Sequence, residues 1–383
     1  MTYLSKLAAE QAGDALYISV LDEIRARRAE FTALRYVPQD MVAKLQRIGV
    51  YRAFVPARFG GDEKTPAEFC RLIEDISAAD ASTGWVASFG VSATYLAALP
   101  PETYAAIYGA DPDTVFAGAI FPPQPAETVT GGVRVSGRWS WCSGVMGASV
   151  VGCGIKVAGE KTPLPRMAVM PRAAVRVEDT WNTIGLAGTG SHDMVVEDVT
   201  VAPEWTLIRG GAPSMDDIAF RFPAMALAAQ VLAVVALGAA REALDYLVAE
   251  TSKRGSITGA PSAGARPYVQ AEFAKAQGLL MGARAAFYDT IEAAWEELKR
   301  TGDVSPDMKV RLRLVASKAA RDGAEAARIA FVIGGSGVMA TGHTLGRCMV
   351  DAACVAQHAF MGEGTWTSAG AAFFDQPTPP GYP

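Results

Sequence analysis

One long stretch near the middle of the chain has the alternating pattern of β-strands, and helical patterns lie on both sides of it. It runs from about residue 114 to 201 and includes a hairpin signal at Gly131 and Gly132. Strands and helices are therefore segregated along the sequence, unlike the alternation that produces a doubly wound parallel sheet. We predict a mainly helical α+β protein with a small antiparallel sandwich or barrel between two helical parts.

The changes of pattern also give the expected domain boundaries. We expect an N-terminal helical domain at 1–112, a β-domain at 113–207 and a C-terminal four-helix bundle with an extended tail at 208–383. Within the β-domain, the proline-rich segment Phe121–Pro125 is expected to be a turn. The expected bundle helices are Leu227–Ala249, Tyr268–Lys299, Pro306–Ile333 and Leu345–Phe360.

The composition excludes several classes of function. The 383 residues carry a net charge of -5, and no dense run of Lys and Arg is present, so nothing indicates a nucleic-acid partner. The sequence has three histidines, and none stands at metal-ligand spacing from a cysteine or another histidine, so we expect no metal site. The 224–240 stretch is apolar but short for a membrane span, and it contains Gln230 and Gly238. It is expected to be a buried helix.

The cysteines and the N-terminus bear on the cellular compartment. The five cysteines form no CxxC pair, and the chain begins with a polar helical pattern in place of a secretory leader. We therefore expect reduced thiols and a cytoplasmic location.

Two glycine clusters are candidates for nucleotide-binding loops, and both lack the required context. Gly185–Gly190 lies between expected strands, so its glycines do not open a helix that could meet a pyrophosphate. Gly334–Gly337 lies between helices and lacks the Lys of a phosphate loop. We predict no resident nicotinamide domain, so a redox enzyme of this sequence would receive its electrons from elsewhere.

The residues from Gly137 to Gly144 read Gly-Arg-Trp-Ser-Trp-Cys-Ser-Gly, a combination of aromatic rings and hydroxyls that suits a flat polar ring. Together with the order of domains, Phe59-Gly60-Gly61 and Gly188-Thr189-Gly190-Ser191, this segment resembles the acyl-CoA dehydrogenase superfamily. Within it the chain is most similar to the flavin-dependent monooxygenases of that fold. These include the oxygenase components of p-hydroxyphenylacetate hydroxylase and of the steroid-degrading phenol hydroxylase, and the indole and dibenzothiophene monooxygenases.

The resemblance implies a site that holds reduced FAD, or FMN in its place. Ser143 would lie near the reactive nitrogen of the flavin, and His358 would be the catalytic histidine. Gly335 and Ser336 would reach the cofactor of a neighbouring subunit, and Arg254 would meet the flavin phosphates. The remaining implied flavin contacts are Trp85, Trp141, Cys142 and Thr189, and the implied substrate pocket consists of Trp85, Phe121, His358 and Phe360.

The resemblance also implies the reaction and the partners. Reduced flavin and O2 give a flavin hydroperoxide, which is preserved only where water is kept out, and Trp85, Trp139 and Trp141 could exclude it. His358 could act as a base on a phenol or indole substrate or as a proton donor to the peroxide, and both roles stay open. A separate NAD(P)H:flavin reductase would supply the reduced flavin, and the protein would form a homotetramer as a dimer of dimers.

The sequence is also compatible with an acyl-CoA dehydrogenase. Glu363, in Gly-Glu-Gly-Thr, resembles the base of those enzymes, although its spacing from Asp351 is long and His358 intervenes. An N-hydroxylating or sulfur-oxidising relative and a scaffold that binds no flavin stay open as well. Several site residues have plain structural interpretations. Trp85 could fill a core gap, His192 could bond its own turn, and Arg347 and Asp351 could form an intrahelical pair.

Overall fold

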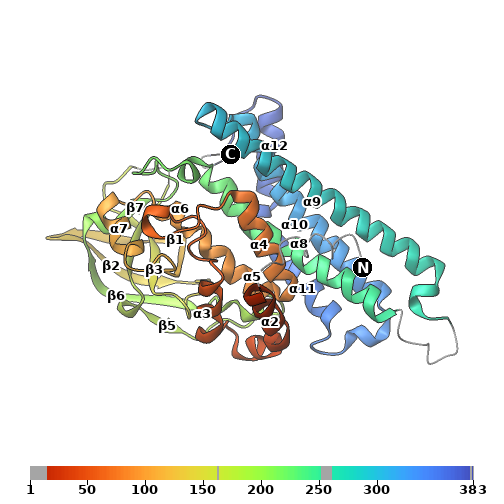
Figure 1. Ribbon diagram of the computed structural model, residues 1–383. Helices are drawn as coiled ribbons and strands as arrows, with labels where there is room; N and C mark the ends of the chain where they lie inside the picture. The colour runs from red at the N-terminus through yellow and green to blue at the C-terminus, as the bar shows by residue number, and fades with distance from the viewer. Residues whose placement is uncertain (1–14, 162–163, 252–260, 380–381, 383) are drawn as a thin grey trace.

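The computed structural model describes residues 15–161, 164–251, 261–379 and 382. One sheet lies at one end of the molecule, and long helices lie side by side at the other (Figure 1). The helices that precede the sheet in the sequence lie partly between it and the bundle and partly, as α6 and α7, over the sheet in this view (Figure 1). They are α2 (Ala15–Leu34), α3 (Gln39–Arg47), α4 (Pro66–Ala79), α5 (Ala81–Ala87), α6 (Ser92–Leu96) and α7 (Pro101–Tyr108).

The seven strands of the sheet follow the order β5-β6-β2-β1-β3-β4-β7. All neighbouring strands are antiparallel except β1 and β3, which are parallel, so the expectation of a purely antiparallel domain is wrong for this one pair. The reason is that the 140–149 loop, which follows β2, crosses the start of β1. Strand β3 therefore begins at the same end of the sheet as β1 and runs in the same direction. The strands are β1 (Phe116–Val129), β2 (Gly132–Trp139), β3 (Val150–Val157), β4 (Arg166–Pro171), β5 (Arg176–Glu178), β6 (Asp193–Val201) and β7 (Thr206–Ile208).

The segment Phe121–Pro125 belongs to β1, so the expected turn is wrong. The pairing register of β1 with β3 shifts between Ala119 and Gln124. Prolines cannot donate to the ladder, and they are accommodated where the strand is irregular. The predicted hairpin at Gly131 and Gly132 is confirmed, because β1 and β2 pair directly on either side of it and both glycines have positive φ.

After the sheet the chain is helical again, as expected. The predicted fourth bundle helix ends earlier than 360, because the His358 side chain accepts a hydrogen bond from the backbone of Phe360 and starts a separate short turn, Ala359–Met361. A further helix that the sequence patterns did not indicate follows this turn. The helices are α8 (Ala224–Thr251), α9 (Pro267–Thr301), α10 (Pro306–Ile333), α11 (Thr344–Ala356) and α12 (Glu363–Phe373).

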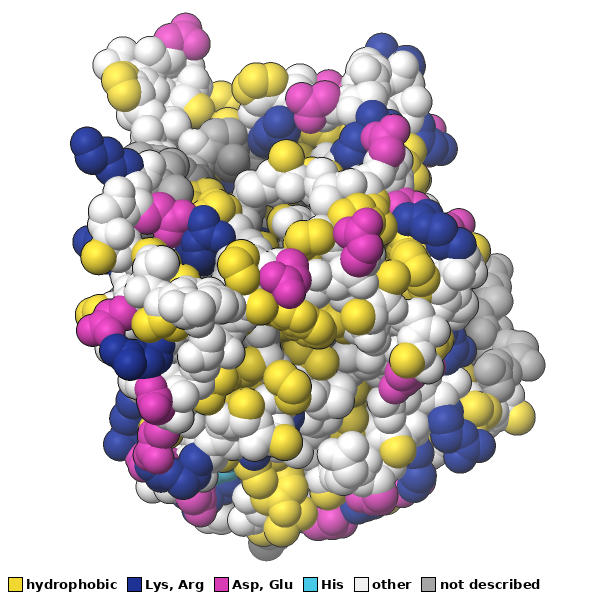
Figure 2. Space-filling view, turned by 90° about the vertical axis from the view of Figure 1, so that its left-hand side faces the viewer, with side chains coloured by type: hydrophobic (Ala, Val, Ile, Leu, Met, Phe, Trp, Pro, Cys, Tyr) yellow, Lys and Arg dark blue, Asp and Glu magenta, His cyan; other side chains and the backbone are white. Residues whose placement is uncertain are grey.

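Helix α8 is the core of the bundle. It is the one helix in the described part of the chain that is long and apolar enough to cross a membrane, and 83% of its most apolar window is buried inside the protein. The expectation of a buried central helix is therefore confirmed. The main hydrophobic core runs through both helical parts without a break, while the sheet has a second core around Trp139. Hydrophobic side chains also gather across the middle of the sheet side of the molecule (Figure 2).

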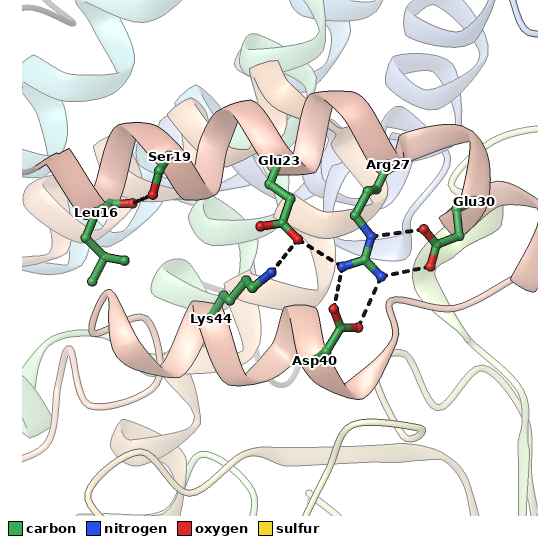
Figure 3. A network of polar contacts seen from close by, with 7 residues as sticks. All are labelled: Leu16, Ser19, Glu23, Arg27, Glu30, Asp40 and Lys44. Carbon is green, nitrogen blue, oxygen red and sulfur yellow. Dashed lines mark hydrogen bonds and ion pairs between the residues drawn. The ribbon is translucent and has the colours of Figure 1, made fainter.

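Polar contacts fix the early helices to their neighbours. In the interior, Glu74 of α4 is ion-paired with Arg284 of α9 at 2.7 Å and accepts a hydrogen bond from Tyr288 at 2.6 Å. A charge that is 1% exposed needs such partners, since an unpaired buried carboxylate costs several kcal/mol. On the surface, Arg27 of α2 bridges to Asp40 of α3 (Figure 3). The contacts of Glu74 therefore fix α4 to α9, and the contact of Arg27 fixes α2 to α3.

Candidate active site

A chain of hydrogen bonds joins three segments that are far apart in the sequence. Nε1 of Trp85, on α5, donates to Oγ of Ser143 at 3.1 Å. The same oxygen lies 2.7 Å from Oγ of Ser191, which lies 2.7 Å from Oγ1 of Thr189. All four side chains are buried. The structure thus brings together Trp85, Ser143 and Thr189, and it adds Ser191, which was not among the residues predicted from the sequence.

His358 approaches this cluster from the C-terminal part of the chain. Its ring centre lies 5.6 Å from that of Trp85 and 5.0 Å from that of Phe360, both in edge-to-face orientation. Nδ1 accepts a hydrogen bond from the backbone N–H of Phe360 at 3.2 Å, so the neutral ring carries its proton on Nε2. Burial lowers the pKa of His358 to about 4, and the imidazole is therefore neutral at pH 7.

The loop after β2 presents Trp141 and Ser143 in opposite ways. Trp141 is 74% exposed and has φ +67°, a left-handed conformation that is strained for an aromatic residue. The next backbone groups are anchored, because Cys142 N–H donates to the carbonyl of His192 at 3.1 Å and Gly144 N–H to that of Thr189 at 2.9 Å. The anchors turn Ser143 inward and leave the Trp141 ring at the surface.

Two buried aspartates hold the segments of the cluster together. Oδ1 of Asp351, on α11, accepts the backbone N–H of Leu186 at 2.6 Å, which ties α11 to the turn before Thr189. Oδ2 of Asp80 caps the start of α5 by accepting the N–H of Thr83 at 2.8 Å. The cap positions the helix that carries Trp85.

Arg347 lies 3.4 Å from Oδ1 of Asp80, so it links α11 to α5. The described contacts of Arg347 and Asp351 include no direct ion pair between the two, because each side chain has its closest partner outside α11, although the charge of Arg347 opposes the rise in the pKa of Asp351. Burial, and then the nearby charge of Asp80, raise the pKa of Asp351 to about 7.

Two predicted ring or thiol contacts are corrected. The Cys142 side chain is fully buried in the sheet core, with Sγ donating to the carbonyl of Trp139, so the thiol does not face a cofactor. Trp139 is also fully buried there, and its Nε1 donates to the carbonyl of Gly154 at 2.9 Å. Side chains of a strand point alternately to its two faces, and Trp139 is at a position of β2 that points into the sheet core. Trp139 therefore cannot shield a ligand from water.

Several predicted residues are not part of the buried cluster. Phe121 is 66% exposed, and Gly335 and Ser336 are exposed in the segment after α10. Arg254 lies outside the described residues. The expectation that His192 bonds its own turn is wrong, because its Nδ1 accepts the backbone N–H groups of Thr180 and Trp181, each at 3.1 Å, in the segment that precedes the turn.

Glu363 does not face the cluster. Its side chain is 81% exposed and forms an ion pair with Arg321 at 2.8 Å. A base that removes a substrate α-proton must lie inside the site, within hydrogen-bond reach of that proton. The geometry therefore argues against a dehydrogenase. The part of the chain that the structure describes also contains no group of side chains suited to a metal ion.

The residues present fit a flavin. The exposed Trp141 ring offers a flat apolar surface, and the hydroxyls of Ser143, Thr189 and Ser191, which are buried, offer hydrogen bonds for a polar ring edge. Ser191 could have been predicted from the sequence, since it directly follows the Gly-Thr-Gly turn that contains Thr189. Nothing in the sequence indicates that Asp80 meets Arg347 or that Asp351 meets the backbone of Leu186.

Comparisons with known proteins agree with this geometry. The models of the acyl-CoA dehydrogenase N-terminal and C-terminal domains match residues 15–100 and 230–363. Indole-3-acetate monooxygenase of Pseudomonas putida is 52% identical over 99% of this chain and 97% of its own length. The oxygenase component of the FADH2-dependent resorcinol hydroxylase of a Rhizobium species is 32% identical over 63% of this chain and 62% of its own length. The crystal structure of 3-HSA hydroxylase from a Rhodococcus species has a TM-score of 0.88 and 26% identity, covering 94% of this chain and 96% of that one.

Proposed function

Because the chain belongs to the flavin-dependent monooxygenases of the acyl-CoA dehydrogenase fold, we propose that its aromatic substrate is indole-3-acetate. The chain is an oxygenase component that uses reduced flavin and O2 to oxidise a small aromatic molecule. The substrate proposal is supported by the relative that is 52% identical over nearly the whole of both chains. The single observation that carries the site is the contact of His358 with Trp85, whose N–H holds Ser143.

We propose that Trp141, Ser143 and Thr189 contact the flavin ring. Bound reduced flavin activates O2 and supplies the oxygen atom that enters the substrate. The contribution of the chain is to hold the ring edge with hydroxyls and to keep water out. Trp85 serves both purposes, since it is 6% exposed and its N–H fixes the Ser143 oxygen.

We propose that His358 acts as a hydrogen-bond donor through Nε2. Its Nδ1 lone pair is occupied by the Phe360 N–H, and a pKa of about 4 makes the ring a weak base at neutral pH. Of the two roles that the sequence left open, donation therefore has the better support. Phe360, 5.0 Å from His358, would form the adjoining wall of the substrate pocket.

The remaining proposals concern assembly. We propose a separate NAD(P)H:flavin reductase as partner, FAD as the preferred flavin, a cytoplasmic location, and a homotetramer in which Gly335, Ser336 and Arg254 serve the cofactor. A relative named as the oxygenase component of an FADH2-dependent hydroxylase supports the first two. Large hydrophobic residues that are exposed, including Ile184 at 86% and Met339 at 72%, support association, as do the hydrophobic side chains visible in Figure 2.

A substrate panel tests the proposal. The protein, with a flavin reductase, NADH and FAD, would be given indole-3-acetate, indole, phenol and resorcinol, with product formation followed by mass spectrometry. We expect the highest kcat/KM for indole-3-acetate and a product that contains one atom from labelled O2. A higher kcat/KM for a simple phenol would contradict the substrate proposal.

A further inference from the structure

Arg313, on α10, is a buried cation that lacks a matching anion in the part of the chain that the structure describes. The residue is 5% exposed, and no carboxylate among the described residues forms an ion pair with it. Its one hydrogen bond to a described residue goes from Nη2 to Oγ1 of Thr365 at 3.4 Å, and Nε has no partner among those residues. Burial lowers the pKa of the guanidinium. A buried charge of this kind costs several kcal/mol unless an anion meets it.

A second donor lies beside it. The ring of Tyr382 is 5.1 Å from Cζ of Arg313, and the buried Tyr382 hydroxyl has no hydrogen-bond partner within the described part of the chain. On another side the Phe360 ring lies 5.4 Å from the same carbon. Two aromatic rings thus hold the guanidinium in place, and the N–H and O–H donors that remain match the two oxygens of a carboxylate.

This pair of donors is connected to the active site through one ring. Phe360, which contacts Arg313, also lies 5.0 Å from His358, and His358 lies 5.6 Å from Trp85. A substrate whose aromatic ring lies beside Trp85 and His358 could extend a short acidic side chain past Phe360 to Arg313.

We propose that Arg313, assisted by the Tyr382 hydroxyl, receives the carboxylate of an arylacetate substrate whose ring lies beside His358 and Trp85. The inference rests on the proposed function, and it names the residue that would distinguish an arylacetate from a neutral indole. Discrimination of this kind is large, because a substrate without the carboxylate leaves the buried donors unpaired.

Another buried arginine provides a matched control. Arg209 is also 5% exposed and has two N–H groups without partners, at Nε and Nη1. It stacks 3.6 Å from the ring centre of Tyr95, on α6, and contacts neither Phe360 nor His358 among the interactions of the described residues. A role in carboxylate binding is therefore assigned to Arg313 and not to Arg209.

The experiment measures the Kd of indole-3-acetate and of indole-3-acetamide, its uncharged analogue, by anaerobic calorimetry on the protein loaded with reduced FAD. The variants are Arg313→Met, Arg313→Lys, Tyr382→Phe and Arg209→Met, each checked for folding by its Tm. For Arg313→Met we expect a Kd about 10- to 100-fold higher for the acid and an unchanged Kd for the amide. Arg313→Lys should restore part of the loss, and Tyr382→Phe should show a smaller selective loss.

If Arg313→Met does not fold, the selective losses in Arg313→Lys and Tyr382→Phe decide the matter. Equal changes for acid and amide in these variants, or a selective loss in Arg209→Met, would overturn the proposal. The outcome is separable from the proposed function. A wild-type protein that binds the acid through Arg313 but oxidises no indole would refute the function and leave the carboxylate site standing.

Discussion

The indole N–H of Trp85 donates to the hydroxyl oxygen of Ser143 at 3.1 Å, across 58 positions of sequence. Trp85 belongs to a helix before the sheet, and Ser143 to the loop that crosses the start of β1. Because His358 packs edge-on against the same indole, Trp85 is the point at which all three parts of the chain meet.

The first prediction concerns this hydrogen bond. Ser143→Ala should destabilise the protein by about 1–3 kcal/mol, because it leaves the buried N–H of Trp85 without an acceptor. Trp85→Phe should add little further loss when Ser143 is already Ala, since the orphaned donor is then gone. Urea denaturation of both single variants and the double variant measures the coupling. Additive effects would mean that the bond contributes nothing.

The second prediction is the pH dependence due to His358. A pKa of about 4 keeps the ring neutral in the folded protein, so kcat should show no acidic limb near 6.5. Because the pKa of His358 is lower in the folded protein than in the unfolded chain, the neutral ring contributes to stability. This contribution is present above about pH 6.5 and is lost as the pH falls through about 4. His358→Ala should abolish product formation, while His358→Gln, which retains an N–H donor, should keep some of it. An acidic limb near 6.5 that disappears in His358→Gln would refute the donor role.

The third prediction concerns Asp351. Its pKa is raised from 3.8 to about 7, so its contribution to stability is present below about 3.8 and is lost as the pH rises through about 7. Asp351→Asn keeps an acceptor for the Leu186 N–H without the charge. The variant should therefore be more stable than the wild type at pH 8 and closer to it at pH 5. Guanidinium denaturation of the wild type and of Asp351→Asn at both pH values tests this prediction. The same change in the free energy of unfolding between pH 5 and pH 8 in the two proteins would contradict it.

The fourth prediction separates the two reaction types. Glu363→Gln should leave oxygenation within about twofold of wild type, because the carboxylate is exposed and its ion pair with Arg321 is a surface contact. The assay is product formation from indole-3-acetate, with His358→Ala as the inactive reference. Loss of activity in Glu363→Gln comparable to that of His358→Ala would revive a role for the glutamate.

Patterns of local sequence predicted most of the fold. The long bundle helices were found within a few residues, because apolar periodicity and the prolines at their first turns are local signals. The strand through Phe121–Pro125 and the parallel pairing of β1 with β3 were not, because both depend on where a loop crosses the sheet. Similarly, the helix predicted at Leu345–Phe360 is too long. His358 begins a new short turn after α11, and in the sequence it looks like an ordinary helical residue.

The site was predictable only where its residues carry a recognisable motif. Trp85, Ser143, Thr189 and His358 came from such motifs, and they lie together. Trp139 and Cys142 shared the motif of Ser143, yet they face the sheet core, because the chain turns directly after β2 and Sγ of Cys142 folds back to the carbonyl of Trp139. The partnerships of Asp80 with Arg347 and of Asp351 with Leu186 join positions more than 160 residues apart, and no local pattern carries that information.

The central claim is that the cluster of Trp85, Ser143 and His358 directs oxygen from reduced flavin into an aromatic substrate. A single-turnover experiment tests it most directly, by mixing anaerobic protein and reduced FAD with labelled O2 and indole-3-acetate and measuring product and hydrogen peroxide together. We expect the wild type to place one atom of most consumed O2 molecules in the product, with the other atom leaving as water, and His358→Ala to release most of the consumed O2 as peroxide. Stoichiometric peroxide and no labelled product from the wild type would contradict the account.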